Sequence, residues 1–473
     1  MKLISQNPAT DEVVWSGSAA TPHEIESAGA RAESVAAQWA QTPLEVRASH
    51  VDRFAEELTA EAESFAQLIS QETGKPLWEA KTEVQAMLGK VRLSQEAFQQ
   101  RRSPTVSESP SGIRSATRYH PLGPCAVLGP YNLPGHLPNA HLIPALLAGN
   151  PVIFKPSEST PGVGQRLFEL WERSGLPTGV VQLLQGGREV GASLVRQPAL
   201  RGIFFTGGRA GGQAILEARG THSEVLIALE LGGNNPLLVW EPCPIDAALP
   251  HILTSAFITT GQRCTCARRL ILPTNAFGDE VVERLIKATA SVTPGNPENR
   301  PEPFLGPLIH APAAQRVYDQ YESLLAQGAE PLHPLSPATG AFLSPGVVDV
   351  SSMTSIPDEE CFGPLLQVIR VDGFEEAICA ANATKYGLSA GLLCHDESRY
   401  EAFARQVRAG IINWNQPLTG ASGAQPFGGI GWSGNHRPSG YFAADFCSYP
   451  TASVESSELT VPASLPPGFP ALS

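Results

Sequence analysis

Between about residues 115 and 240, short β-rich runs alternate with helical stretches, and this rhythm constrains the fold more than any other feature. Strands are expected at residues 126–128, 152–154, 180–184, 202–205, 225–229 and 237–240. Helices are expected at residues 162–173, 189–196 and 211–219. A chain that alternates strand and helix in this way favours an open, mostly parallel sheet covered by helices. The predicted fold class is therefore α/β.

The first hundred residues, in contrast, are predicted to be helical. Thr21-Pro22-His23-Glu24 has the pattern of a capping box with proline at the first helical position. Helix-favouring sequence follows at residues 24–40, 46–71 and 79–99, and Gly74 supplies a stop signal. The Ser- and Pro-rich residues 101–112 are predicted to form a loop.

A second α/β stretch begins near residue 245. Helices are expected at residues 245–260, 276–291, 313–327, 374–383 and 397–408, and strands at residues 270–272, 366–371 and 411–414. Residues 451–473 are rich in Pro and Ser and have few apolar anchors. This tail is predicted to be either a frayed end or an arm that needs a partner surface.

Charge and composition exclude several classes of protein. With 42% apolar residues and 17% charged residues, the chain is not disordered as a whole. Its net charge of −13 argues against nucleic acid as a partner, and a small acidic substrate would need a local cationic pocket. No signal peptide is apparent, and the longest apolar stretch, residues 137–154, is interrupted by prolines and asparagines, so no membrane contact is expected.

Neither the cysteines nor the histidines have the spacing of a metal site. Among eight cysteines there is no CxxC pair, since Cys264 and Cys266 are separated by one residue. The eleven histidines likewise show no ligand spacing. No metal is assigned, and a reducing, cytoplasmic setting is expected.

Two junctions between a strand and a helix carry groups suited to a nucleotide. Thr206-Gly207-Gly208-Arg209-Ala210-Gly211-Gly212 follows an apolar strand and opens a helix, where backbone N–H groups can approach a phosphate. Its spacing also fits a plain turn. Lys155-Pro156-Ser157-Glu158 follows another strand, and its carboxylate suits ribose hydroxyls and repels a 2′-phosphate. The alternative for this motif is a solvated loop.

Three further residues are candidates for catalysis. Glu230 ends an apolar run, where burial would raise its pKa and make it a plausible base near pH 7. Cys264 follows a glycine turn and Arg263, whose positive charge would lower the thiol pKa and favour a nucleophilic thiolate. Asn132, between two prolines, could donate to a developing oxyanion. Taken singly, an inert core cysteine and an Asn that stabilises its own turn remain the alternatives.

These motifs occur together and in order, and the chain resembles the aldehyde dehydrogenase superfamily over nearly its whole length. The resemblance is carried by Gly-Gln-Arg-Cys-Thr-Cys-Ala-Arg-Arg at 261–269, Leu-Gly-Gly-Asn-Asn-Pro at 231–236 and Gly-Asn-His-Arg-Pro-Ser at 434–439. Within the superfamily, these phrases are similar to the subfamily that oxidises N-succinylglutamate 5-semialdehyde in arginine catabolism by the succinyltransferase pathway.

The resemblance implies roles for individual residues. Cys264 matches the nucleophile, Glu230 the general base that activates water, and Asn132 the oxyanion-hole donor. NAD is the implied cofactor, and the residues expected to bind it are Lys155, Ser157, Glu158, Gly207, Gly208, Arg209, Ala210, Gly211, Gly212, Glu360 and Phe362. The substrate carries two carboxylates, for which Arg263 is the first candidate and His436 the second, and Phe427 lies in a segment that lines the site. A surface ion pair is the alternative for Arg263.

The architecture implied by the resemblance has three parts. A Rossmann-type NAD-binding domain is expected to comprise residues 1–110 and 122–232, with a return segment near 420–440. An α/β catalytic domain with the nucleophilic cysteine would span 233–420, and residues 111–121 and 441–473 would form a small oligomerisation arm. A homodimer or homotetramer is therefore expected.

Three other functions remain open from the sequence. The same chemistry could act on glutamate or succinate semialdehyde. A catalytically idle structural member is a second alternative, although Cys264, Glu230, Asn132 and Lys155 are all retained. A cysteine hydrolase that works without nicotinamide is the third, although no Cys–His pair is apparent.

Overall fold

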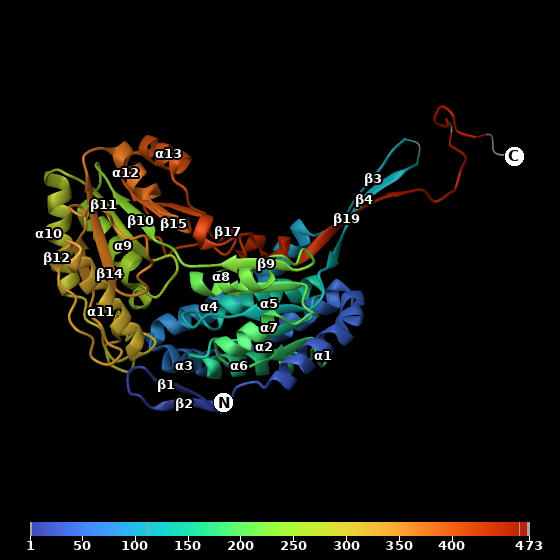
Figure 1. Cartoon of the computed structure of the whole chain (residues 1–473), viewed down its shortest axis with the longest axis horizontal. Helices are drawn as coiled ribbons and strands as arrows, with labels where there is room; N and C mark the ends of the chain where they lie inside the picture. The colour runs from blue at the N-terminus through green and yellow to red at the C-terminus, as the bar shows by residue number, and fades with distance from the viewer. Residues whose placement is uncertain (1, 111, 463, 471–473) are drawn as a thin grey trace.

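Two β-sheets, each packed against helices, form the body of the molecule, and an extended arm leaves it at one end (Figure 1). The computed structural model describes residues 2–110, 112–462 and 464–470. The predicted α/β fold class is confirmed. Within the described residues, no helix has the length and apolar character needed to span a membrane.

The amino-terminal region is helical after a short hairpin of β1 (Lys2–Gln6) and β2 (Val13–Ser18). Its helices are α1 (Pro22–Gln41), α2 (Leu44–Ala60), α3 (Ala62–Thr73) and α4 (Leu77–Arg101). The predicted capping box is confirmed, because Thr21 accepts from the backbone of Glu24 while the Glu24 carboxylate accepts from the backbone of Thr21. The single helix expected at 46–71 is two helices, which meet at the non-helical Glu61. Gly74 ends α3 with a left-handed φ of 75°, as predicted.

The first sheet is entirely parallel and has the strand order β7-β6-β5-β8-β9. Its strands are β5 (Cys125–Leu128), β6 (Val152–Lys155), β7 (Val181–Leu183), β8 (Gly202–Thr206) and β9 (Leu226–Glu230). The helices of this region are α5 (His136–Ala148), α6 (Pro161–Arg173), α7 (Arg188–Val195) and α8 (Arg209–Arg219). All five strands and three of these helices were predicted within a few residues.

Helix α5 was not predicted, because prolines interrupt its sequence. Pro144 lies inside the helix, yet every residue from Leu137 to Ala148 is buried. Burial of so much apolar surface outweighs the local cost of the proline.

The strand order of the first sheet defines where a ligand can bind. The chain passes from β5 outward to β6 and β7, and then returns to the other side of β5 for β8 and β9. The carboxyl ends of neighbouring parallel strands on either side of such a reversal leave a crevice between their loops. Lys155, Thr206 and Glu230 each end a strand at this edge.

The second sheet has seven strands in the order β12-β13-β14-β11-β10-β15-β16, and only the β12–β13 pair is antiparallel. The strands are β10 (Asn235–Val239), β11 (Ala267–Pro273), β12 (Glu330–His333), β13 (Gly346–Asp349), β14 (Leu365–Val371), β15 (Ser389–Leu393) and β16 (Ile411–Trp414). Its helices are α9 (Ile245–Phe257), α10 (Ala276–Ala290), α11 (Ala311–Ala326), α12 (Phe374–Asn382) and α13 (Glu397–Gln406). Strands β12, β13 and β15 were not predicted.

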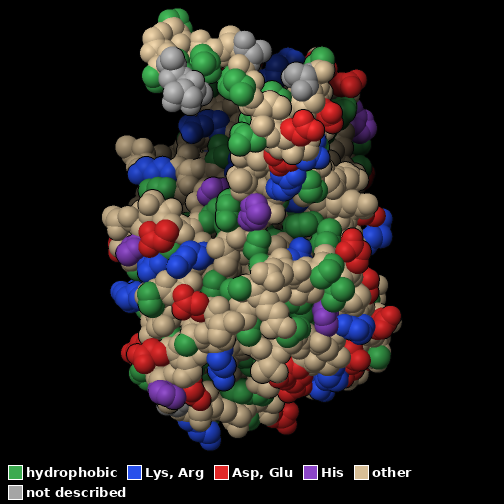
Figure 2. Space-filling view, turned by 90° about the vertical axis from the view of Figure 1, so that its right-hand side faces the viewer, with side chains coloured by type: hydrophobic (Ala, Val, Ile, Leu, Met, Phe, Trp, Pro, Cys, Tyr) green, Lys and Arg blue, Asp and Glu red, His purple; other side chains and the backbone are tan. Residues whose placement is uncertain are grey.

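The arm is a three-stranded antiparallel sheet that projects from the body (Figure 1). It contains β3 (Thr105–Glu108), β4 (Arg114–Pro121) and β19 (Ser448–Glu455), with β4 in the middle. The prediction of a loop at 101–112 is thus wrong for β3, whose four side chains are all exposed and gave no alternating apolar signal. Figure 2 shows this end of the molecule, where acidic and basic side chains are interspersed.

The carboxyl-terminal part of the chain also returns to the first sheet. Residues 426–440 form the small hairpin of β17 (Pro426–Phe427) and β18 (Ser439–Gly440). Ala443, Ala444, Phe446 and Cys447 are buried in the same apolar core as β5, β6 and α5. The division of the chain into domains stays a prediction, with these last residues packed on the first sheet rather than along the arm.

Candidate active site

Two cavities meet at Cys264, between the carboxyl edge of the first sheet and the amino ends of β10, β11 and β14. The α4 cavity has a volume of about 270 Å³ and is lined by one face of α4, by α5 and by residues of the 419–440 segment. The glycine-loop cavity, of about 380 Å³, is lined by the loops that follow β5, β6 and β8. Asn132, Leu137 and Cys264 line both cavities. Cys264 can therefore contact two different molecules at once.

A strained turn precedes Cys264. The predicted helix at 245–260 ends at Phe257 because Thr259, Thr260 and Gly261 adopt left-handed φ values of 55°, 53° and 72°. Such angles are costly for threonine and persist only where surrounding contacts impose them. The Thr260 hydroxyl donates to the backbone oxygen of Gly306 at 2.7 Å, and the Thr259 hydroxyl donates to the carboxylate of Glu79.

Two buried polar side chains fix the turn from the other side. Arg268, which is fully buried, donates to the backbone oxygens of Gly261 at 2.8 Å and of Arg263 at 2.9 Å. The amide of Asn235 donates to the backbone oxygens of Cys264 at 2.7 Å and of Cys266 at 2.8 Å. Both residues lie in motifs that resemble the family, but neither had a predicted role. The available signal was a polar side chain at the start of an otherwise apolar strand.

The environment of Cys264 differs from the one that we expected. Burial raises the pKa of the Cys264 thiol well above its usual range, and the neighbouring Glu230 carboxylate raises it further. The prediction that Arg263 lowers this pKa is wrong, because the guanidinium is paired with Glu79 instead. A base is thus needed to ionise the thiol.

Glu230 is placed to be that base. It is fully buried at the end of β9, and neither of its carboxylate oxygens accepts a hydrogen bond of ordinary geometry from a described residue. Burial raises the pKa of Glu230 to about 7, an increase that the nearby Cys264 thiol and Thr206 hydroxyl partly offset. A carboxylate with this pKa can accept a proton from Cys264 or from water near neutral pH.

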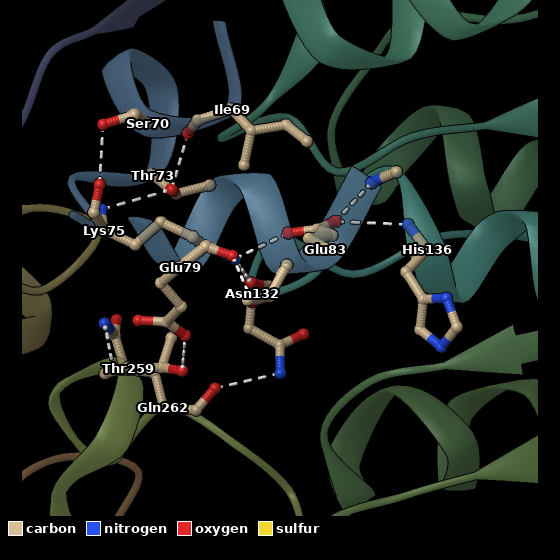
Figure 3. Close-up of polar contacts among 12 residues, drawn as sticks. Ile69, Ser70, Thr73, Lys75, Glu79, Glu83, Asn132, His136, Thr259 and Gln262 are labelled. Atoms are coloured by element: carbon tan, nitrogen blue, oxygen red, sulfur yellow. Dashed lines mark hydrogen bonds and ion pairs between the residues drawn. The ribbon is translucent and has the colours of Figure 1, made fainter. Parts of the chain in front are cut away.

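Asn132 lines the same two cavities as Cys264. It is held on two sides, as Figure 3 shows. Its amide nitrogen donates to the backbone oxygen of Gln262 at 2.9 Å, which leaves its second N–H free. Its backbone oxygen accepts from the ammonium of Lys75 at 2.6 Å. Among the described residues, the backbone N–H of Cys264 has no acceptor. These two N–H groups are the available donors for an oxyanion.

The predicted cofactor residues divide into those that line cavities and those that do not. Gly207 and Gly208 line the glycine-loop cavity, and Ala210 and Gly211 line a neighbouring cavity of about 600 Å³ between β6, α7 and α8. Ser157 and Glu158 line both. Arg209 instead stacks on Trp432, with 3.4 Å from its guanidinium carbon to the ring centroid. A side chain at Gly212 would collide with Leu231, so this glycine permits packing.

The glycine loop fits a phosphate-containing ligand. Gly208 caps the amino end of α8, no side chain supplies a hydrogen bond there, and the space around its α-carbon is open. Lys155 lies nearby at the end of β6, with 5% of its surface exposed, and its ammonium is 3.6 Å from the Glu158 carboxylate. Unsatisfied N–H groups, open space and a buried cation are the features that a dinucleotide requires.

Glu360 and Phe362 enter the glycine-loop cavity from the second sheet. The Glu360 carboxylate accepts from the backbone of Gly233 at 3.1 Å and lies 3.7 Å from Arg268. Phe362 packs edge-on against Tyr131, with ring centroids 6.1 Å apart. Both side chains thus lie opposite the glycine loop, as their predicted role at the nicotinamide ribose requires.

The three predicted substrate residues are placed differently. Phe427 lines the α4 cavity. Arg263 lines it too, but its guanidinium donates to the carboxylate of the buried Glu79 at 2.9 Å, a buried pair rather than the surface pair considered from the sequence. His436 lies in a left-handed turn and lines neither cavity that Cys264 borders.

The described residues contain no group of three or more His, Cys, Asp and Glu side chains arranged to hold a metal ion.

Comparisons with known proteins agree on one family. The model of the aldehyde dehydrogenase family matches residues 2–452. A curated relative, N-succinylglutamate 5-semialdehyde dehydrogenase of Burkholderia orbicola, is 48% identical over 99% of this chain and 96% of its own length. Two solved structures are similar over most of the chain. A mutant of 1-pyrroline-5-carboxylate dehydrogenase from Thermus thermophilus has a TM-score of 0.89 and 31% identity, covering 96% of this chain and 90% of its own. Glyceraldehyde-3-phosphate dehydrogenase from Methanocaldococcus jannaschii, complexed with NADP, has a TM-score of 0.89 and 26% identity, covering 96% and 99%.

Proposed function

The chain belongs to the aldehyde dehydrogenase family, and on that premise we propose that it oxidises N-succinylglutamate 5-semialdehyde to N-succinylglutamate with NAD, in arginine catabolism. The observation that carries the substrate assignment is the 48% identity, over 99% of the chain, to a relative that bears this activity as its name. The glutamate and succinate semialdehydes are the competing substrates. An idle role is disfavoured because the thiol, the base and the oxyanion donors all lie around one point.

The proposed reaction begins with proton transfer from Cys264 to Glu230. Because the pKa of the buried thiol is raised, attack is coupled to this transfer. The sulfur then forms a bond to the aldehyde carbon, and the resulting oxyanion is stabilised by the amide of Asn132 and the backbone N–H of Cys264. The aldehyde reaches the sulfur through the α4 cavity.

The hydride of this carbon would leave for bound NAD, which would supply the hydride acceptor. Gly207, Gly208 and the amino end of α8 would hold its pyrophosphate, and Lys155 and Glu158 its adenosine ribose. Glu158 supports NAD over NADP, because its carboxylate would repel a 2′-phosphate. Glu360 and Phe362 face the loop from the other side of the cavity.

Glu230 completes the reaction: after it has released the Cys264 proton to solvent, its carboxylate activates the water that hydrolyses the thioester on Cys264. Its raised pKa of about 7 makes it a base of suitable strength for water, and its carboxylate oxygens are free to accept that proton. Water attacks the thioester carbon, the carbon–sulfur bond breaks, and the free acid leaves. A buried base beside Cys264 supports water, rather than a second thiol, as the acceptor of the acyl group.

The assembly and its location are also part of the proposal. The three-stranded arm carries Val106, Tyr449 and Val454 with 56%, 51% and 79% of their surface exposed. A projecting sheet with exposed apolar residues and an open edge supports pairing with another copy of the chain, as a homodimer or homotetramer. All eight cysteines are free thiols, which supports a reducing compartment such as the cytoplasm.

A panel of aldehydes tests the proposal. Purified protein is mixed with NAD and with the succinylglutamate, glutamate or succinate semialdehyde, and NADH formation is followed by absorbance. We expect kcat/KM for the succinylated substrate to exceed the others by about 10²-fold, since each lost hydrogen bond to a charged group costs about 1.5–3 kcal/mol. A higher kcat/KM for either competitor would reject the assigned substrate, and no NADH with any aldehyde would reject the activity.

A further inference from the structure

Lys90 is a buried cation that faces the α4 cavity without a partner. Only 3% of its surface is exposed, and it lines the cavity that ends at Cys264. Within the described part of the chain, its ammonium group forms no ion pair and no hydrogen bond. An ammonium group in such a place is costly, and burial accordingly lowers the pKa of Lys90 to about 8.

The other charged groups around this cavity are paired with one another. On α4, the Glu83 carboxylate lies 2.7 Å from the ammonium of Lys75 and accepts from two backbone N–H groups, as Figure 3 shows. Glu79, one turn earlier, accepts from Arg263 and Thr259. Three cations thus face two carboxylates, and the excess positive charge is that of Lys90.

The remaining walls of the cavity add no charge that could neutralise Lys90. The residues of the 419–440 segment that line it are Thr419, Ala421, Ser422, Gly423, Phe427, Ser439 and Gly440. His136 of α5 also lines the cavity. Burial and the neighbouring cations lower the pKa of its imidazole to about 3, so the ring is neutral at physiological pH. A carboxylate that enters the cavity is therefore the partner that the ammonium lacks.

The wall opposite Lys90 is shaped to leave its ammonium accessible. A β-carbon added at Gly423 would lie 3.9 Å from Lys90 Nζ and 2.9 Å from Leu93 Cδ1. A larger residue there would occupy the space next to the charge. The glycine thus keeps room for a ligand group beside the ammonium.

We propose that Lys90 is the specificity-determining residue that binds a carboxylate of the substrate, and that Arg263 is a positioning residue for the Cys264 turn. The assignment rests on the proposed function, in which the substrate is a dianion. It reverses the order expected from the sequence, where Arg263 was the candidate cation. The reversal follows from Glu79, which neutralises Arg263 and has no counterpart at Lys90.

The test compares a carboxylated aldehyde with an uncharged aliphatic aldehyde in three proteins: the wild type, Lys90→Met and Lys90→Arg. We expect the charged-to-uncharged ratio of kcat/KM to fall about 10- to 100-fold in Lys90→Met, mainly through KM, and to be partly restored in Lys90→Arg. An unchanged ratio in Lys90→Met would overturn the proposal. The ratio is measured with whichever semialdehyde the wild type prefers, so the substrate assignment can fail while Lys90 is still tested.

Thermal unfolding separates this role from a structural one. A lysine that serves only to bind substrate destabilises the free enzyme, so Lys90→Met should raise the Tm. A lowered Tm together with equal losses of kcat/KM for both aldehydes would mean that Lys90 supports the fold, and would also overturn the proposal.

Discussion

The two cavities beside Cys264 differ in what lines them: mainly backbone in one and mainly side chains in the other. The glycine-loop cavity is formed by backbone at the carboxyl ends of parallel strands, and it would suit a cofactor shared by many enzymes. The α4 cavity is formed by side chains from a helix, a strained turn and a distant segment, and the charged residues that line it are Glu83, Lys90 and Arg263. We therefore expect the glycine-loop cavity to determine the chemistry and the α4 cavity to determine the choice of aldehyde.

Substitution of Cys264, one of three residues that line both cavities, has the largest expected effect. In Cys264→Ser, kcat should fall by about 10⁴-fold or more, since a serine hydroxyl is far less readily ionised than a thiol. NADH formation measures the loss. NAD binding, followed by fluorescence, should persist because the glycine loop is intact. An unchanged rate would contradict the whole mechanism.

Glu230→Gln should slow both halves of the reaction, because the proposed mechanism uses this carboxylate first for the Cys264 proton and then for water. NADH formation should slow by about 10²- to 10⁴-fold, and rapid mixing should show no early turnover of NADH ahead of the steady rate. In the wild type, activity should fall as the pH drops below about 7, because Glu230 becomes protonated. A wild-type pH profile that is flat between pH 6 and 8 would contradict this role.

Glu230→Gln should lower activity but raise the stability of the folded protein. Burial raises the pKa of Glu230 in the folded protein to about 7, above its value in the unfolded chain. The contribution of Glu230 to the free energy of unfolding therefore decreases as the pH rises through the range between these two pKa values. Glu230→Gln should therefore raise the free energy of unfolding at pH 8, by on the order of 3 kcal/mol. Denaturant titration at pH 5 and pH 8 provides the comparison, with little gain expected at pH 5.

Arg263→Met tests whether, in the α4 cavity, Arg263 is a positioning residue and Lys90 alone binds the substrate. The variant should lower the free energy of unfolding by about 3–5 kcal/mol, because it leaves the buried Glu79 unpaired. It should lower kcat/KM by about 10²-fold for charged and uncharged aldehydes alike, since the Cys264 turn moves. The double variant Glu79→Gln/Arg263→Met is the matched control and should recover stability. A loss confined to charged aldehydes would return the binding role to Arg263.

Glu158→Gln has the smallest expected effect and concerns only the cofactor side. The ratio of kcat/KM with NADP to that with NAD should rise roughly fivefold, because a partly exposed charge contributes only about 1 kcal/mol. Steady-state kinetics with both cofactors and one aldehyde measure the ratio. The ratio of charged to uncharged aldehydes should not change, and a change would contradict the independence of the two cavities.

The elements around the glycine-loop cavity were predicted from the sequence better than the contacts around the α4 cavity, and the reason is physical. Strands, helix caps and glycine turns are encoded by neighbouring residues, so β5 to β9 and the loop at 206–212 were anticipated within a few residues. The pairing of Arg263 with Glu79 joins residues 184 positions apart, and nothing local marks it. Lys90 gave no signal for the same reason, since its lack of a partner is a property of the folded cavity.

Helix α5 and the pKa of Cys264 show the same limit. Two prolines obscured α5, whose stability comes from complete burial rather than from its own residues. For Cys264, adjacency in sequence suggested that Arg263 lowers the thiol pKa, whereas the fold places Glu230 beside the sulfur. Motifs indicated the candidate reacting groups, but the electrostatic state of the thiol depended on long-range contacts.

The burial of Ala443, Ala444 and Phe446 against the first sheet has a consequence for biosynthesis. The ribosome delivers these residues only after the entire second sheet has emerged. Until then, the nascent first sheet presents an unfilled apolar surface to solvent, where chaperones would recognise it. Folding of the first sheet is therefore completed only by one of the last segments to be translated. A chain that terminates near residue 440 should aggregate rather than form a working first sheet.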